Sequence, residues 1–179
     1  MSTHTNRPAV GESALRKALA HRVVIADGAM GTMLQEQNPT LEDFEGYEGC
    51  NEILNISRPD IVKAVHRKYL EVGVDSIETN TFGANWANLA EYGIEDRIYE
   101  LAFAGAKLAR EVADEFSTAD KPRWVLGSLG PGTKLPTLGH TEYAHLKEAT
   151  SPLRVDCSMT APMPCLSRPR RISCKRRLR

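Results

Sequence analysis

Three short apolar segments of the chain have the composition of buried β-strands. They are Val23–Ala26, Val74–Phe82 (centred on Ser76–Thr79) and Trp124–Gly127. Short continuous apolar runs are typical of strands that are covered on both faces of a parallel sheet. Each run ends in polar or glycine residues, which predicts a loop at the carboxyl end of each strand.

The segments around these runs have the apolar spacing of helices. The pattern predicts helices at residues 12–22, 57–73, 96–116 and 141–149. In the second of them we expect Ser57 to be the N-cap, Pro59 and Asp60 to lie in the first turn, and Gly73 to follow the last turn. The acidic stretch 39–52, which contains two glycines, predicts a long loop.

The alternation of strand and helix predicts an α/β fold built from parallel βα units. Two architectures fit, a (β/α)₈ barrel and an open doubly wound sheet, and periodicity does not separate them. In both, the ligand site lies at the carboxyl ends of the strands. That edge would carry Asp27, residues 78–81 and Ser128. Three βα units fall short of the eight that close a barrel.

Charge divides the chain into regions. Residues 151–179 contain seven Arg and one Lys against a single acid, Asp156, a net charge of +7; because the whole chain is neutral, the first 150 residues carry −7. The domain is therefore predicted at 12–150, after a disordered leader at 1–11. Prolines recur through 151–179 and predict neither a helix nor a central strand there, so we expect a disordered basic tail. Our hypothesis for this tail is a reading-frame shift near codon 151, which sequencing of the encoding DNA would test.

The composition, 41% hydrophobic and 26% charged, is that of a globular domain in water. No apolar run approaches the length of a membrane helix, and the polar start predicts no secretory signal, so a cytoplasmic location is expected. The four cysteines are irregularly spaced and predict no disulfide framework. Cys50 is interpreted as an ordinary loop cysteine, and His66 is predicted to be exposed on its helix.

Four local motifs occur in a fixed order at the strand ends and in the loop between them. They are Asp27-Gly28-Ala29-Met30-Gly31-Thr32, Gly49-Cys50-Asn51-Glu52, Glu78-Thr79-Asn80-Thr81-Phe82-Gly83 and Gly127-Ser128-Leu129-Gly130-Pro131. Together they resemble the homocysteine S-methyltransferase family, in particular the N-terminal homocysteine-binding module of the cobalamin-dependent methionine synthases. The resemblance covers about residues 20–150.

The resemblance implies a (β/α)₈ barrel that binds homocysteine through a zinc ion held by three cysteine thiolates. Zinc lowers the pKa of the substrate thiol, and the resulting thiolate takes the methyl group of methylcobalamin to give methionine. The substrate-binding residues that the resemblance implies are Asp27, Gly28, Ala29, Glu78, Thr79, Asn80 and Ser128. Asp27 and the Gly28 backbone would face the amino acid end of homocysteine.

The cysteines that hold zinc in this family belong to later strands, and the cysteines of this chain do not match them. Cys157, Cys165 and Cys174 lack the close pairing of structural zinc sites. We therefore expect no metal ligand and no catalytic residue in this chain. We expect no bound zinc or methylcobalamin, and activity would need the folate and cobalamin modules of a full-length enzyme.

Two further sequence features suggest alternative functions. Residues 127–134 resemble a phosphate-binding loop, but Thr133 precedes Lys134 where the motif needs the reverse order. The Arg-rich end, 168–179, could bind a polyanion by counterion release, yet it has no interleaved aromatic residues. We weigh three interpretations: an enzyme module, a non-catalytic half-barrel and a binding protein with a basic tail. We assign the chain to the enzyme family by descent and expect it to be a fragment that is inactive alone. Salt-dependent binding of a polyanion would instead indicate the third interpretation.

Overall fold

The computed structural model describes residues 14–149 and 165–167, so the leader and most of the tail lie outside the described residues. Three-residue 3₁₀ turns occur at 51–53, 95–97 and 136–138. The helices and strands are α1 (Ala14–His21), α2 (Met30–Gln35), α3 (Leu54–Ser57), α4 (Pro59–Glu71), β1 (Ser76–Glu78), α5 (Trp86–Leu89), α6 (Ile98–Phe116), β2 (Trp124–Leu129), α7 (Tyr143–Ala149) and β3 (Cys165–Ser167).

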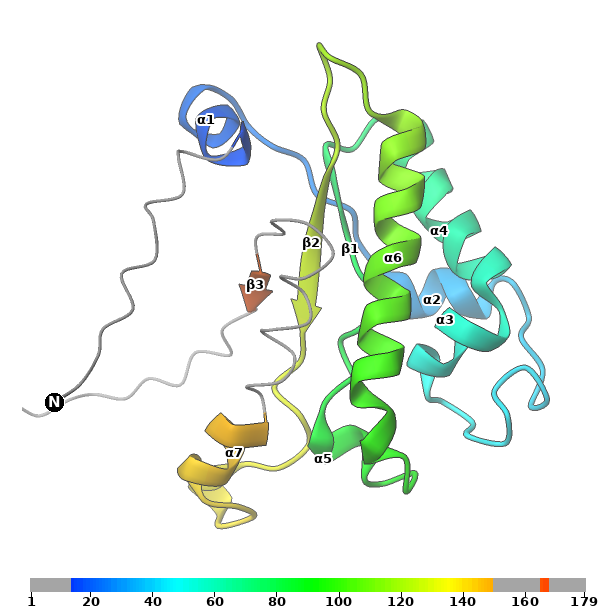
Figure 1. Ribbon diagram of the computed structural model, residues 1–179, viewed down its shortest axis with the longest axis vertical. Helices are drawn as coiled ribbons and strands as arrows, with labels where there is room; N and C mark the ends of the chain where they lie inside the picture. Colours follow the sequence, from blue (N-terminus) through cyan, green and yellow to red (C-terminus); the bar gives the residue numbers. More distant parts are fainter. Residues whose placement is uncertain (1–13, 150–164, 168–179) are drawn as a thin grey trace, which may run out of the picture.

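The strands form a parallel sheet in the order β1-β2-β3 (Figure 1). Ile77 pairs with Val125 between β1 and β2, and Ser128 pairs with Leu166 between β2 and β3. β3 was not predicted, and it corrects the expectation of a disordered tail at residues 165–167. It lies at the end of the strand order, where a short strand forms a hydrogen-bonded ladder on one side only and needs no long apolar run.

The first predicted strand lies where expected, but its predicted burial is wrong. Ala26 forms a parallel bridge with Ser76, and the Ser76 amide donates to the carbonyl of Ile25 at 3.1 Å. The segment therefore extends the sheet beside β1. Val23 and Ile25 are nevertheless 82% and 57% exposed, because the part of the chain that the structure describes packs nothing over them. An apolar run predicts that a side chain can be buried, but its burial needs a covering element.

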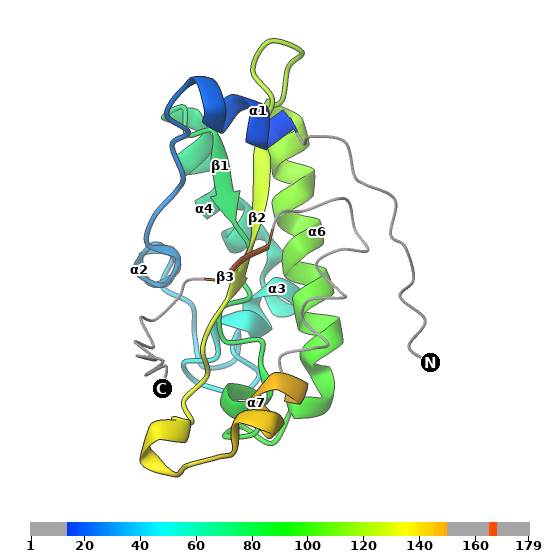
Figure 2. The ribbon, with the colours of Figure 1, turned by 90° about the vertical axis from the view of Figure 1, so that its left-hand side faces the viewer.

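Helices α4 and α6 cover one face of the sheet, as both ribbon views show (Figures 1 and 2). β1, α6 and β2 form the βαβ unit that the sequence predicts, with α6 as the crossover helix. Small residues let α6 approach the strands, and the apolar cluster between helices and sheet consists of Leu70, Val74, Ile77, Ala109, Val112, Ala113 and Val125. This core fixes the carboxyl ends of β1 and β2 side by side.

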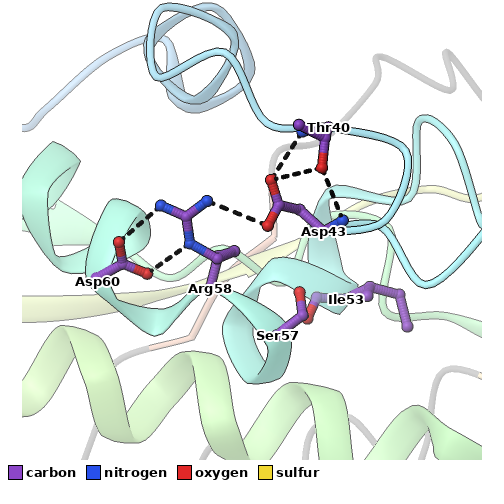
Figure 3. A network of polar contacts seen from close by, with 6 residues as sticks. All are labelled: Thr40, Asp43, Ile53, Ser57, Arg58 and Asp60. Carbon is purple, nitrogen blue, oxygen red and sulfur yellow. Dashed lines mark hydrogen bonds and ion pairs between the residues drawn. The ribbon is translucent and has the colours of Figure 1, made fainter.

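Helix α4 begins differently from the prediction. Ser57 is the last residue of α3, and its hydroxyl donates to the carbonyl of Ile53 at 3.2 Å, so it is not the N-cap (Figure 3). Arg58 takes that position, and its guanidinium binds both Asp60 and Asp43. The ion pair with Asp43 joins the 39–52 loop to the start of α4. At the other end, Gly73 has a positive φ of 97° and follows the last turn as predicted.

His66 is buried, which corrects the prediction that it lies on the surface. It is 0% exposed, and the buried residues of α4 are Ile61, Val62, Val65, His66 and Leu70. The buried face is wide because α4 packs against α2, α3, α6 and β1. Within the described residues, neither ring nitrogen of His66 has a hydrogen-bond partner. An apolar stripe predicts which face of a helix turns inward but not how far burial spreads around it.

The remaining predicted helices match the structure closely: α1, α6 and α7 lie within their predicted ranges. The helices α2, α3 and α5 were not predicted, because they have only six, four and four residues. No helix among the described residues has the length and apolar character needed to cross a bilayer.

Candidate functional site

A cavity of about 490 Å³ opens at the carboxyl ends of the strands. All seven residues that the sequence predicts as a substrate-binding set line it, so the fold brings them together from the ends of three neighbouring strand segments. The described residues that line it are Asp27, Gly28, Ala29, Met30, Gly31, Asn51, Glu52, Glu78, Thr79, Asn80, Phe82 and Ser128. Their role in binding stays a prediction, but their convergence on one concave surface is observed.

Asp27 connects the first strand segment to the end of β1. Its amide donates to the carbonyl of Ser76 at 3.0 Å. Its two carboxylate oxygens both accept the amide hydrogen of Glu78, each at 3.0 Å. A carboxylate oxygen can accept more than one hydrogen bond, so the contact with the strand end is compatible with a hydrogen bond from a ligand.

Thr79, Thr81 and Ser128 form a closed circuit of hydrogen bonds across the two strand ends. The Ser128 amide donates to the Thr79 hydroxyl at 3.0 Å, and the Thr81 hydroxyl donates to the Ser128 carbonyl at 2.8 Å. The Thr79 hydroxyl must then donate to that of Thr81, 2.6 Å away. The Ser128 hydroxyl donates to Oε2 of Glu78 at 3.0 Å. This network orients the Glu78 carboxylate at the cavity wall.

Asn80 is fixed in place by the second loop. Its Nδ2 donates to the Asn51 carbonyl at 2.8 Å and to Oδ1 of Asn55 at 3.0 Å. In turn, Nδ2 of Asn55 donates to the backbone carbonyl of Asn80 at 2.8 Å. Both amide hydrogens of Asn80 are therefore used within the protein, and its Oδ1 is the atom that remains to accept a hydrogen bond from a ligand.

Glu52 lines the cavity although it is not among the site residues predicted from the sequence; it belongs to the second of the four motifs. It is 7% exposed, and its Oε1 accepts the Gly83 amide hydrogen at 2.6 Å. Burial raises the pKa of this carboxyl above its ordinary value, although the Gly83 amide acts in the opposite direction. The sequence did contain a sign of a functional role for Glu52: it is an acidic residue next to an asparagine in a loop motif, and loop residues often carry function.

Cys50 does not have the properties of a metal ligand. Its side chain is buried, and burial together with the neighbouring Glu52 raises the pKa of the thiol to about 11. A thiol with this pKa is protonated at neutral pH. Among residues 14–149, no three His, Cys, Asp or Glu side chains are grouped so that they could hold a metal ion. Cys157 and Cys174 lie outside the described residues.

The electrostatics of the cavity favour a cation. Among the described residues, its lining contains three carboxyl groups, those of Asp27, Glu52 and Glu78, and no Lys, Arg or His. The backbone of residues 28–31 approaches the same space at the start of α2. A small ligand with an ammonium group would find acceptors here, and backbone amides could face a carboxylate.

The segment that resembles a phosphate-binding loop has a different structure. Residues 127–129 belong to β2, and no α-helix starts at Lys134. The Lys134 ammonium instead lies 3.4 Å from a carboxylate oxygen of Glu91. The geometry that cradles a nucleotide phosphate at a helix start is not formed by these residues.

Curated relatives match most of the described chain. It is 58% identical over 135 residues to the methionine synthases of Mycobacterium tuberculosis and of Mycobacterium leprae. The match covers 75% of this chain and 11% of each relative, so the chain spans about a tenth of their length.

Solved structures share the fold. The homocysteine methyltransferase MmuM from Escherichia coli matches in its metallated form with a TM-score of 0.53 and 22% identity, over 76% of this chain and 44% of that one. The oxidized form matches with a TM-score of 0.54 and 24% identity, over 65% and 40%. A family model described as homocysteine S-methyltransferase matches residues 24–154. The chain therefore belongs to the homocysteine S-methyltransferase family.

Proposed function

We propose that the described cavity binds the amino acid end of homocysteine, and that the chain serves methyl transfer to homocysteine to give methionine. The convergence of Asp27, Glu78 and Ser128 on one acidic cavity carries this proposal. The ammonium group would pair with Asp27 and Glu78, whose positions the hydrogen bonds at the strand ends fix. The carboxylate would face the backbone of residues 28–31. The high identity to methionine synthases supports the choice of substrate.

We also propose that the observed sheet is the first part of a (β/α)₈ barrel acting in the cytoplasm. The parallel βαβ unit and the location of the cavity at the carboxyl ends of its strands support this architecture. Homocysteine methyltransferases of known structure share the fold over about two fifths of their length. In a barrel, Val23 and Ile25 would be covered by residues that are not among those described.

Zinc and methylcobalamin are the groups that the family resemblance implies, and the described residues do not fit the metal. They offer one buried thiol with a raised pKa and no cluster of ligands. We infer that this part of the chain contributes substrate binding: it would orient homocysteine through its ammonium and carboxylate groups. The folate and cobalamin modules of a longer enzyme are proposed partners, since the chain spans 11% of its curated relatives.

Replacing Asp27 by Asn tests the ammonium contact. Asn retains an oxygen that can accept the Glu78 amide hydrogen but loses the charge that would pair with the substrate. Hydrogen bonds to charged groups contribute about 1.5–3 kcal/mol, so the dissociation constant for L-homocysteine should rise about 10- to 100-fold. Isothermal titration calorimetry on the full chain measures this change.

Two controls make the result specific. Asp120→Asn removes an exposed carboxylate outside the cavity and should leave the affinity unchanged. N-acetyl-homocysteine, which has no ammonium group, should bind the wild type and Asp27→Asn equally weakly. Equal affinity of the wild type for homocysteine and its N-acetyl derivative would show that the acidic cavity does not bind the ammonium group.

A further inference from the structure

The Glu52 carboxyl lies against the backbone of the loop that follows β1. It belongs to the 3₁₀ turn at 51–53, and its Oε1 accepts the Gly83 amide hydrogen at 2.6 Å. A Cβ atom at position 83 would lie 2.8 Å from Oε1 and 2.9 Å from Oε2, so only glycine permits this approach. The carboxyl is thereby held at the cavity wall with one oxygen already engaged.

Within the described part of the chain, the side-chain partner of the second Glu52 oxygen is a weak donor. The Cys50 sulfur lies 3.8 Å from Oε2, a long contact from a weak donor. The other titratable groups near Glu52 are Tyr92, whose pKa burial raises, and the cavity carboxylates of Asp27 and Glu78. None of these neighbours is a cation that could stabilise an ionised Glu52.

A neutral carboxyl in the cavity would avoid repulsion of the carboxylate of the proposed ligand and would offer it a hydrogen-bond donor. An α-amino acid brings one ammonium group, which two carboxylates can hold, and one carboxylate, which needs hydrogen-bond donors. A third ionised carboxyl would repel the ligand carboxylate. Glu52 is the most buried of the three, and burial raises its pKa.

We propose that Glu52 is a ligand-binding residue that presents a carboxyl O–H, on Oε2, to the carboxylate of the bound amino acid. Asp27 and Glu78 take the ammonium group at the same time. Oε1 acts as the carbonyl-type oxygen because it already accepts the Gly83 amide hydrogen. This assignment rests on the proposed function, and it makes Glu52 a determinant of specificity for zwitterionic ligands over simple amines.

Infrared spectroscopy of the full chain at neutral pH tests the protonation state without any ligand. The wild type should show the absorption band of a protonated carboxyl group, and Glu52→Gln should remove it. Glu42→Gln, which changes an exposed glutamate outside the cavity, should leave the band in place. A spectrum without this band in the wild type, or one that Glu52→Gln leaves unaltered, would overturn the proposal.

The pH dependence of L-homocysteine binding tests the contact itself. As the pH is raised across the neutral and mildly alkaline range, the wild-type affinity should fall by about tenfold or more once Glu52 loses its proton. Glu52→Gln keeps a neutral side chain with an oxygen for Gly83 and an N–H donor for the ligand, so its affinity should vary less with pH. Far-UV circular dichroism checks that the variant is folded.

The possible failures can be told apart. If homocysteine binds and the pH profiles of the wild type and Glu52→Gln coincide, the Glu52 contact is wrong while the proposed function stands. If the folded wild type binds no homocysteine across this range, the proposed function fails and the Glu52 contact fails with it.

Discussion

Lowering the pH from 6.5 to about 4 is expected to reduce the free energy of unfolding by about 3 kcal/mol through His66 alone. Burial lowers the pKa of this imidazole from 6.5 to about 4. The folded chain therefore keeps His66 neutral while the unfolded chain protonates it. The stabilisation is fully present above pH 6.5 and is lost as the pH falls towards 4. Urea denaturation at several pH values measures the slope.

His66→Leu separates this effect from other acid-sensitive groups. The variant removes both unpartnered ring nitrogens, each of which is costly to bury, and should be about 2 kcal/mol more stable than the wild type at pH 7. The difference in free energy of unfolding between His66→Leu and the wild type should grow as the pH falls from 7 to 5. This range lies above the ordinary pKa values of Asp and Glu, so those groups contribute little to the change. His21→Leu, at an exposed position, provides the matched control. Parallel pH profiles for the wild type and His66→Leu would show that His66 is solvated.

The order of strands and helices could be predicted because the relevant signals are local. Apolar runs located the strands at 76–78 and 124–129, and helical spacing located α6 within two residues at its amino end. Once parallel βα units are recognised, the carboxyl ends of the strands must share an edge. That geometric rule is why Asp27, Glu78 and Ser128 could be grouped from the sequence alone.

The remaining features depend on contacts between distant segments. Glu52 lies in a loop without periodicity, so nothing local indicates that its side chain packs against Gly83. His66 is buried by neighbours that its own helix does not specify, and Ser57 is excluded as an N-cap by the preceding helix α3. Each case needs knowledge of what packs against a residue, which a single sequence does not provide.

Gly130 belongs to the fourth motif, but the reason why glycine is needed at this position is visible only in the structure. It follows β2, and its amide donates to the carbonyl of Phe82 at 3.0 Å. This hydrogen bond joins the loop after β1 to the end of β2, beside the cavity that Phe82 and Ser128 line. A Cβ atom at position 130 would come within 2.1 Å of the Phe82 carbonyl oxygen. That oxygen belongs to the backbone, so a side-chain rotation cannot relieve the clash.

Gly130→Ala is therefore expected to lower the free energy of unfolding by about 3 kcal/mol, at the upper end of the usual cost of overpacking. The two loops must separate, which breaks the hydrogen bond to Phe82 and widens the cavity, so homocysteine affinity should fall together with stability. Gly31→Ala is the matched control: it lines the same cavity, and its added Cβ would lie at an ordinary 3.5 Å from Asn51. Because alanine favours a helix over glycine, that variant should change stability by less than about 1 kcal/mol. Urea midpoints for both variants measure the difference, and a Gly130→Ala chain as stable as Gly31→Ala would mean that the two strand ends are not joined in this way.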